Sequence, residues 1–259
     1  MKPALLAIAV ALASICAFAQ ADPQPKSSKW ALVEELVLAN RILFEEGILD
    51  AYGHVSVRDP ENPNHFLLAR HLAANVVTAS DIIEYDFDAK PVNGDPSTGY
   101  TERFIHSEIY RARPDVMAVV HTHAADLIPF TVTSVPLRPI YHMGGFLGEG
   151  VPVFEIRKAG GMTDMLIRSS ELGRALANTL GKKPAVLLRG HGAVVVAPSL
   201  HMVTGRAYYM NLNARLQWQA MQMGGAPITF LDPEEASKAS AQDGYERAWA
   251  SGKQRVQSK

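Results

Sequence analysis

The chain has 259 residues, 47% of them hydrophobic, and carries 25 Lys and Arg against 26 Asp and Glu. This length supports the hydrophobic core of a single domain. The near-neutral charge argues against nucleic acid as the main partner, because no basic field is available to hold a phosphate backbone. The single cysteine excludes an internal disulfide framework.

The first residues have the pattern of a secretory signal peptide. Lys2 supplies a positive start, an almost unbroken apolar run extends from Ala4 to Phe18, and Ala19-Gln20-Ala21 has the small residues of a cleavage site. The apolar run is shorter than the about 20 residues that span a bilayer, which disfavours a permanent anchor. We therefore predict a signal peptide over 1–21, cleaved after Ala21, and a periplasmic or secreted domain over 22–259 that is not bound to a membrane.

Hydrophobic periodicity predicts helices and strands that are interleaved along the rest of the chain, which indicates a single α/β domain. The predicted helices cover 29–48, 102–111 and 201–223. The predicted strands cover 54–57, with 66–68 as its hairpin partner, 116–120, 185–189 and 193–197. The apolar runs at 116–120 and 185–189 are typical of central strands of a parallel sheet, buried on both faces. The polar, basic segment from Lys238 to Lys259 predicts a solvated or oligomer-embracing tail.

Three histidines carry the chemistry that the sequence suggests. His121 and His123 are two residues apart at the end of a predicted strand, so the period of two directs both imidazoles to the same face. His191 follows another apolar run in Arg189-Gly190-His191-Gly192, where the glycines allow a tight turn and close approach of a ligand. Three neutral imidazoles with an open position suit a catalytic zinc ion or another divalent transition metal. As a bare pattern, His-x-His is also compatible with structural or solvent-facing histidines.

Glu102 and His106 form a second pair upstream. They are four residues apart, so a helix would place them on one side. A carboxylate beside a cation can serve as a ligand or as a proton-transferring base. Spacing alone favours the structural interpretation, a glutamate stabilised by the helix dipole and a packing histidine.

The combination of these motifs resembles the class II aldolase/adducin family, which includes L-fuculose-phosphate aldolase and L-ribulose-phosphate 4-epimerase. The resemblance rests on Glu102-x-x-x-His106, on the segment 109–124 with His121 and His123, and on the Leu-Leu-Arg-Gly-His-Gly segment with His191. It implies that His121, His123 and His191 are metal ligands. It also implies that Glu102 binds the metal in the resting site and acts as acid or base.

The same resemblance carries expectations about the fold and the assembly. It implies a three-layer α/β/α fold of class II aldolase type with a central, largely antiparallel sheet, in place of the parallel strands that the apolar runs suggest. It implies a homotetramer with sites at the subunit interfaces. A neighbouring subunit could supply a proton-donating tyrosine, for which Tyr208 and Tyr209 are candidates.

Two stretches depart from the sugar-phosphate members of the family. Those members hold phosphate with a Gly-Asn-x-Ser turn and a Ser-Ser pair, where this chain has Gly53-His54-Val55-Ser56 and Tyr100-Thr101. An imidazole and a bulky tyrosine replace small donors, which disfavours a phosphorylated sugar. The segment 53–58, followed by Leu-Ala-Arg-His at 68–71, is similar to the branch that contains 3,4-dihydroxyphthalate decarboxylase.

Candidate substrate-binding residues come from these variant stretches. They are His54, Ser56, Arg70, His71 and Thr101. The planar guanidinium of Arg70 could pair with a substrate carboxylate, although a surface ion pair is an equal alternative. His54 and His71 could donate hydrogen bonds, and Ser56 could instead serve the turn backbone.

The resemblance implies a metal-dependent carbon–carbon lyase, of aldolase or decarboxylase type. Its substrate would be a small hydroxy, keto or hydroxy-aromatic acid, cleaved through a metal-stabilised enediolate-like intermediate. The expected cofactor is Zn²⁺, with Mn²⁺ or Fe²⁺ as alternatives. Two other functions stay open: an epimerase or non-haem iron oxygenase on the same scaffold, and a non-catalytic module like the adducin head. The adducin head lacks the metal ligands, so their retention argues against the last.

Overall fold

The computed structural model describes residues 29–96, 98–224, 227–240 and 244–258. The predicted signal peptide at 1–21 therefore lies outside the described residues. Within the described ranges, no helix combines the length and the apolar composition that crossing a membrane requires.

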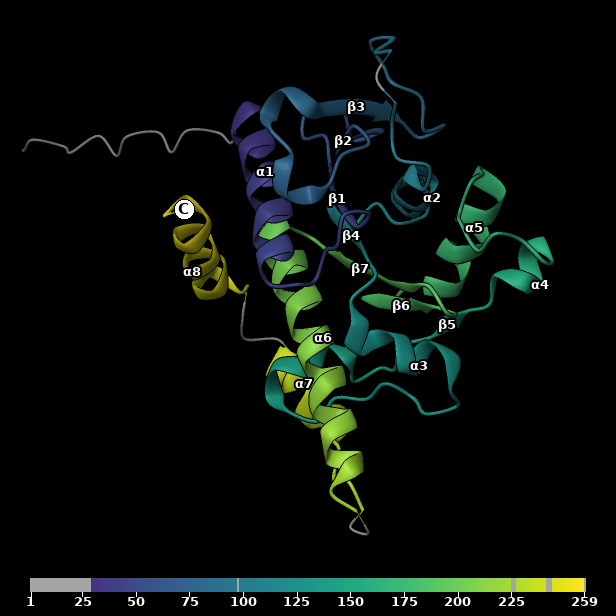
Figure 1. Cartoon of the computed structure of the whole chain (residues 1–259), viewed down its shortest axis with the longest axis vertical. Coiled ribbons are helices and arrows are strands. Elements are labelled where there is room, and N and C mark those ends of the chain that lie inside the picture. Colours follow the sequence, from purple (N-terminus) through teal and green to yellow (C-terminus); the bar gives the residue numbers. More distant parts are fainter. Residues whose placement is uncertain (1–28, 97, 225–226, 241–243, 259) are drawn as a thin grey trace, which may run out of the picture.

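One sheet runs through the described part of the chain, with seven strands in the order β3-β2-β1-β4-β7-β6-β5 (Figure 1). Every neighbouring pair is antiparallel except β5 with β6. The strands are β1 (His54–Arg58), β2 (His65–Ala69), β3 (Ile82–Asp86), β4 (Ala118–Thr122), β5 (Val153–Phe154), β6 (Ala185–Leu188) and β7 (Gly192–Ala197). The largely antiparallel sheet is confirmed, and the parallel arrangement suggested by the apolar runs is wrong. Those runs arise because helices cover both faces of the sheet, which buries its central strands whatever their direction.

The helices form the two outer layers of the fold. They are α1 (Lys29–Glu45), α2 (Arg103–Ala112), α3 (Ile128–Val132), α4 (Ile156–Gly160), α5 (Ser170–Leu180), α6 (Leu200–Gln222), α7 (Pro233–Ser240) and α8 (Glu246–Gln257), with short 3₁₀ turns η1 (Ala74–Val76), η2 (Ala79–Asp81), η3 (Ala125–Leu127) and η4 (His142–Leu147). The long helices α1 and α6 cover one face of the sheet, and α2 and α5 cover the other (Figure 1).

Side-chain alternation along the strands builds two hydrophobic cores, one on each face. On β4, Ala118 and Val120 belong to the core under α1 and α6, whereas Val119 belongs to the core under α2 and α5. This division follows from the strand period of two. The three-layer α/β/α fold that the family resemblance implies is therefore confirmed.

The ends of α6 follow from local chemistry. The Ser199 hydroxyl accepts the Met202 backbone N–H at the start of the helix, as an N-cap residue does. Gly224 follows the end of the helix with φ +70°, a left-handed conformation that glycine adopts without a side-chain clash. The predicted helix over 201–223 is thus placed to within one residue at each end.

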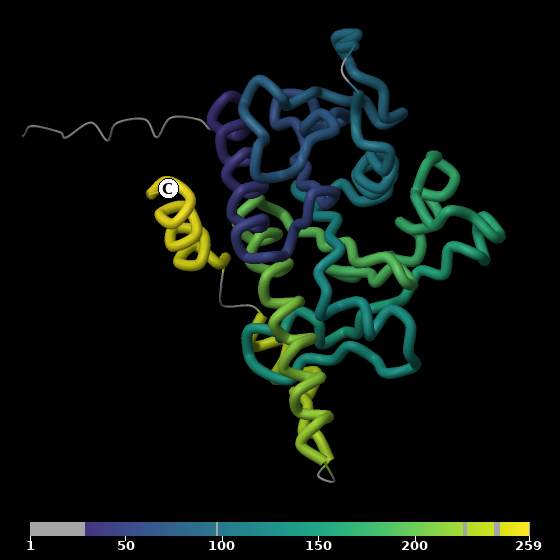
Figure 2. Tube along the Cα trace, viewed as in Figure 1, coloured from purple at the N-terminus to yellow at the C-terminus, as the bar shows by residue number. Residues whose placement is uncertain are grey.

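The C-terminal segment is more structured than its composition suggests. Its last helix, α8, packs on α1 and α6 of the same chain (Figure 2). Trp249 of α8 is 7% exposed and joins the core under α1 and α6. One buried tryptophan is enough to dock an otherwise polar helix, because an aromatic side chain buries a large apolar area. Most of the other side chains of α8 stay exposed to solvent, and contact with a neighbouring subunit stays a prediction.

Candidate metal centre

Strand β4, the middle strand of the sheet, brings His121 and His123 together at its end. His121 lies within β4 directly opposite His54 of β1, and His123 follows the end of β4. The Nε2 atoms of His121 and His123 are 3.1 Å apart, so both imidazoles turn to the same side, as the two-residue spacing predicts.

The turn between β6 and β7 delivers His191 to the same point. Gly190 has φ +62°, which places it in the left-handed region that favours glycine. A Cβ on Gly192 would lie 2.0 Å from the Thr122 carbonyl oxygen. At Gly192 the close approach is therefore made by strand β4, and close approach of a ligand to this turn stays a prediction. The His191 Nε2 lies 3.1 Å from the His123 Nε2.

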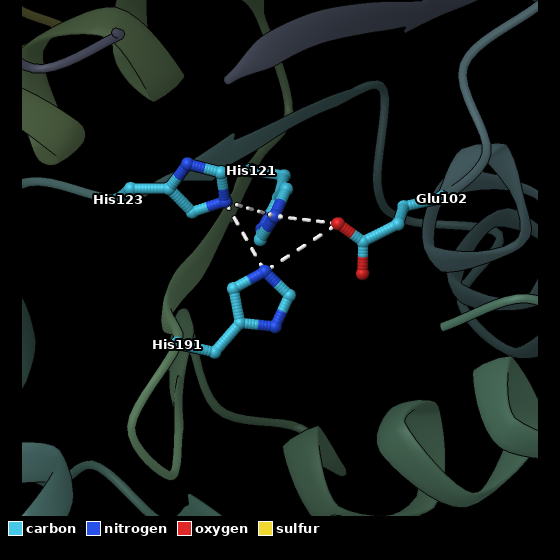
Figure 3. A group of neighbouring side chains, drawn as sticks. All are labelled: Glu102, His121, His123 and His191. Carbon is cyan, nitrogen blue, oxygen red and sulfur yellow. Dashed lines mark hydrogen bonds and ion pairs between the residues drawn. The ribbon is translucent and has the colours of Figure 1, made fainter. Parts of the chain in front are cut away.

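Glu102 completes the group from the residue that precedes α2. Its Oε1 accepts the Ile167 backbone N–H at 2.8 Å. Its Oε2 lies 3.4 Å from the Nε2 atoms of both His121 and His191. One ligand atom from each of Glu102, His121, His123 and His191 thus falls within 4.8 Å of the others (Figure 3).

The hydrogen bonds around these histidines fit a cation. Each Nδ1 has its own acceptor: the Ala193 carbonyl for His121 at 3.2 Å, the Asp50 carboxylate for His123 at 3.1 Å, and the Met165 carbonyl for His191 at 3.1 Å. Neutral imidazoles that donate through Nδ1 carry lone pairs on Nε2. Three lone pairs that converge with a carboxylate oxygen repel one another unless a cation lies between them, so the four residues fit a divalent metal ion.

The charge states of Glu102 and His123 also suit a cation. Burial by itself would raise the pKa of Glu102, but His121 and His191, which donate to it and carry positive charge when protonated, outweigh burial and hold the pKa well below its usual value. A divalent cation at the same point would favour the ionised carboxylate in the same way. Burial, with His121 nearby, lowers the pKa of His123 although Asp50 opposes the shift. An ionised carboxylate and a neutral imidazole are the forms that bind metal. For His191, burial lowers the pKa but the Glu102 carboxylate outweighs burial and raises it.

Two supports of the centre were not predicted from the sequence. Asp50 accepts the Tyr52 and Gly53 backbone N–H groups as well as bonding to His123. Its position three residues before a glycine is an Asx-turn signal that could have been found. The backbone at 165–167 holds both Glu102 and His191, and Met165 adopts φ +72° there. A bulky residue in this region is strained, and such strain is typical of functional sites.

A cavity of about 340 Å³ opens beside the centre. Its lining includes Glu102 and His123, two of the four residues that could hold a metal ion and that we call the metal-type centre. The rest of the lining is largely aromatic: Tyr52, His54, His71, Tyr100, Thr101 and Leu166. The structure therefore brings His54, His71 and Thr101, three of the predicted substrate-binding residues, together with Glu102. A larger cleft of about 800 Å³ lies at the opposite ends of the central strands, where its lining includes Val116 and Ala197.

The other predicted residues lie elsewhere. Ser56 is fully buried behind the cavity and bonds to His106 and Tyr110. Arg70 donates from Nε to Asp81 at 2.6 Å. Tyr208 and Tyr209 lie on α6, where they pack against the core under α1 and α6. They do not line the cavity of the same chain.

His106 is fully buried, and both of its ring nitrogens make hydrogen bonds. Its ring lies between β1 and α2, where it bonds to His54 and Ser56. Burial, with the charge of His121, lowers the pKa of His106 to about 3. Glu102 and His106 therefore have different roles. Glu102 faces the metal-type centre, whereas His106 supports the wall of the cavity.

The fold and the site together define an α/β/α protein with a centre of three histidines and one carboxylate. The profile described as "Class II Aldolase and Adducin N-terminal domain" matches residues 34–218. The chain therefore belongs to the class II aldolase and adducin family, as its motifs indicate.

Individual relatives sharpen this assignment. The decarboxylase tropJ of Talaromyces stipitatus is 39% identical over 241 residues, which cover 84% of this chain and 91% of that protein. The 3,4-dihydroxyphthalate decarboxylase of Arthrobacter keyseri is 32% identical, with 78% and 84% covered. The solved L-fuculose 1-phosphate aldolase of Glaciozyma antarctica PI12 superposes with a TM-score of 0.70 at 25% identity, over 90% and 93% of the two chains. These relatives support a metal-dependent lyase.

Proposed function

We propose that the protein is a metal-dependent carbon–carbon lyase that decarboxylates a small hydroxy-aromatic acid. The observation that carries the proposal is the cavity, in which Glu102 and His123 face a wall of aromatic and imidazole rings. Among the described residues that line it, none is Arg or Lys. A planar ring fits such a wall, whereas a phosphate dianion would find no cationic side chain there.

His121, His123, His191 and Glu102 would hold the ion, which we propose to be Zn²⁺. Bound there, a divalent cation would act as a Lewis acid that stabilises negative charge developing on substrate oxygens. Glu102 has one oxygen fixed by the Ile167 N–H and one that faces the centre. We assign the second oxygen to proton transfer: it takes the proton of a substrate hydroxyl and returns it to the ring carbon that loses carbon dioxide.

The chain's other residues bind and orient the substrate. His54, His71 and Thr101 line the cavity and would donate hydrogen bonds to its oxygens. Ser56 would not contact the substrate but would orient His54 through the hydrogen bonds of His106. Arg70, adjacent to His71 in sequence and half-exposed, would pair with a second carboxylate that extends out of the cavity.

A product screen with the zinc-loaded protein tests this function. We expect carbon dioxide release from dihydroxybenzoate-type acids and no aldehyde release from sugar acids or sugar phosphates. Glu102→Gln should reduce the rate by about 10²- to 10⁴-fold, the usual contribution of a general acid or base. Glu108→Gln is the matched control, because Glu108 is equally buried on α2 but pairs with Arg111 and Arg174 away from the cavity.

Product assays with zinc-loaded and iron-loaded protein, together with metal analysis, separate the competing functions. Aldehyde release would restore the aldolase, and strict dependence on oxygen with iron-loaded protein would indicate an oxygenase. If the protein bound no stoichiometric metal and His121→Ala changed nothing, the assembly module would replace all enzymatic proposals.

We also propose export and assembly for this enzyme. The charge and apolar pattern of residues 1–21 supports a signal peptide cleaved after Ala21, which the intact mass of the protein from its native host would test. A homotetramer is the expected assembly, and light scattering measures it directly.

A further inference from the structure

A chain of buried hydrogen bonds runs from the cavity into the protein between β1 and α2. His54 Nδ1 lies 2.7 Å from His106 Nε2, His106 Nδ1 lies 2.6 Å from Ser56 Oγ, and Ser56 Oγ lies 2.8 Å from the Tyr110 hydroxyl. All four residues are at most 2% exposed. Because bulk water is excluded between these residues, each polar hydrogen that lies between two of them must find its acceptor within the protein. His54 is the one member of this set that also lines the cavity, so a hydrogen on its far side can be met there.

Counting these hydrogens gives the chain a direction. In the described part of the structure, Ser56 Oγ is the one acceptor within hydrogen-bonding distance of the Tyr110 hydroxyl. The Tyr110 O–H therefore donates to Ser56, and the Ser56 O–H is left to donate to His106 Nδ1. A neutral His106 then carries its hydrogen on Nε2 and donates it to His54 Nδ1. His54, in turn, carries its own hydrogen on Nε2.

The two other arrangements each leave a buried hydrogen without an acceptor. If His54 donated from Nδ1, His106 would donate to Ser56 Oγ. The Ser56 O–H would then either displace the Tyr110 O–H from its acceptor or lack one itself. An unsatisfied buried donor costs about 1–3 kcal/mol, so these arrangements are disfavoured. Burial also lowers the pKa of His106 to about 3, which agrees with the neutral imidazole that the count requires.

We propose that Ser56 and His106, anchored by Tyr110, are positioning residues that hold His54 in the Nε2–H tautomer and so present a neutral hydrogen-bond donor to the substrate cavity. The ring of Tyr100 lies against His54 with centroids 4.3 Å apart, which keeps the imidazole from turning. The tautomer follows from the contacts alone. Its role in recognition rests on the proposed function.

A neutral donor has a consequence for substrate class. A hydrogen bond from an uncharged N–H stabilises a carboxylate or phenolate oxygen without a full counter-charge. The described residues lining the cavity include neither Arg nor Lys, so a phosphate dianion away from the metal ion would lose its hydration without a cationic side chain to replace it. This chain of hydrogen bonds therefore favours a singly charged oxygen of an aromatic acid over a phosphorylated sugar.

Nitrogen NMR of the zinc-loaded protein with ¹⁵N-labelled histidine tests the tautomer directly. The chain has nine histidines, and the signal absent from His54→Gln identifies His54. We expect the chemical-shift pattern of an Nε2-protonated ring. An Nδ1-protonated ring at His54 would overturn the proposal, whatever the enzyme's activity.

Three variants test the positioning. Ser56→Ala removes the donor to His106, so we expect His54 to become a mixture of both tautomers. Ser56→Thr keeps the hydroxyl and should retain the Nε2–H form. Tyr110→Phe should also retain it, because the Ser56 O–H still has His106 as its acceptor. Equal loss in Ser56→Ala and Ser56→Thr, or an unchanged tautomer in Ser56→Ala, would overturn the role of the hydroxyl.

Binding of a probe connects the tautomer to recognition. We expect Ser56→Ala to weaken 3,4-dihydroxybenzoate binding to the zinc-loaded protein by about 2-fold for an equal mixture of tautomers, because only the Nε2–H form of His54 presents the donor. Inorganic phosphate should bind weakly to every variant. If His54 shows the expected tautomer but dihydroxybenzoate does not bind, the proposed substrate class fails while the positioning stands. If both variants of Ser56 bind the probe equally, the positioning has no role in recognition.

Discussion

The two faces of strand β1 differ in the kind of residue that they bury. Toward α2, His54, Ser56 and Arg58 place polar groups in the interior, and each has a partner there. Toward α1 and α6, Val55 and Val57 join an apolar core. Burying a polar group costs free energy unless its hydrogen bonds are made, whereas burying an apolar one is favourable. The face toward α2 therefore positions polar groups next to the candidate site, and the face toward α1 and α6 stabilises the fold.

The largest expected effect breaks the polar side at its metal-type centre. His121→Ala removes one of three imidazoles from a fully buried position. We expect stoichiometric metal to be lost and carbon dioxide release to fall by about 10³-fold or more, since Lewis-acid stabilisation contributes several kcal/mol. Metal analysis and product assays measure both. Full metal content in this variant would contradict the assignment of His121 as a ligand.

A core substitution breaks the apolar side instead. Leu36→Ala on α1 empties a fully buried position and should lower the free energy of unfolding by about 2–5 kcal/mol. Urea unfolding measures this change. Trp30→Ala is the control on the same helix, since Trp30 is 62% exposed and should change stability by less than about 0.5 kcal/mol. Metal affinity of the folded Leu36→Ala protein should stay as in the parent, and a large loss would show that the two faces are coupled.

A smaller effect sharpens the comparison at the edge of the centre. Asp50→Asn weakens the acceptor that orients His123 and should lower metal affinity by about 10- to 100-fold. Asp232→Asn is matched to it, because Asp232 also accepts the backbone N–H two residues later but lies at α7. Competition with a metal chelator measures the affinities. Equal affinities in the two variants would remove Asp50 from the support of the centre.

The smallest effect concerns a polar contact on the apolar side. His201 of α6 stacks on Trp249 of α8 with ring centroids 4.2 Å apart, and bonds to Glu246 at 2.8 Å. The ion-pair contact with Glu35, together with Glu246 and against burial, raises the pKa of His201. A raised pKa in the folded state means that the protonated pair stabilises the fold below the unfolded value of about 6.5. This contribution disappears as the pH rises through the folded value.

We expect this pH-dependent contribution to stay below about 1 kcal/mol, because solvent screens a partly exposed pair. The difference in unfolding free energy between the parent and His201→Gln isolates it from the histidines of the metal-type centre. That difference should shrink from pH 5.5 to pH 9. A constant difference would show that stacking, not charge, docks α8.

Much of the fold was predictable because its signals are local. The apolar positions of 29–48 and 201–223 recur with helical spacing, and α1 and α6 form there. Strands β1 and β2 pair as the predicted hairpin. Strand direction was not predictable from the apolar runs, because helices on both faces bury parallel and antiparallel strands alike. The short strand β5 and the polar helix α8 were missed because tertiary packing decides them. Strand β3 and helix α5 were also missed, although α5 has a local signal that could have been found: an amphipathic run between the cap Ser169 and Gly181.

The sequence by itself determined which side chains meet at the metal-type centre. His121, His123 and His191 have residue types and spacing that suit a divalent cation, the family resemblance of the motifs adds Glu102, and the fold brings all four together. Only the tertiary structure decided what orients them. The carbonyls of Met165 and Ala193 and the N–H of Ile167 come from distant segments. Every residue has a backbone carbonyl and nearly every residue an N–H, so no sequence pattern marks the ones that a folded chain will use.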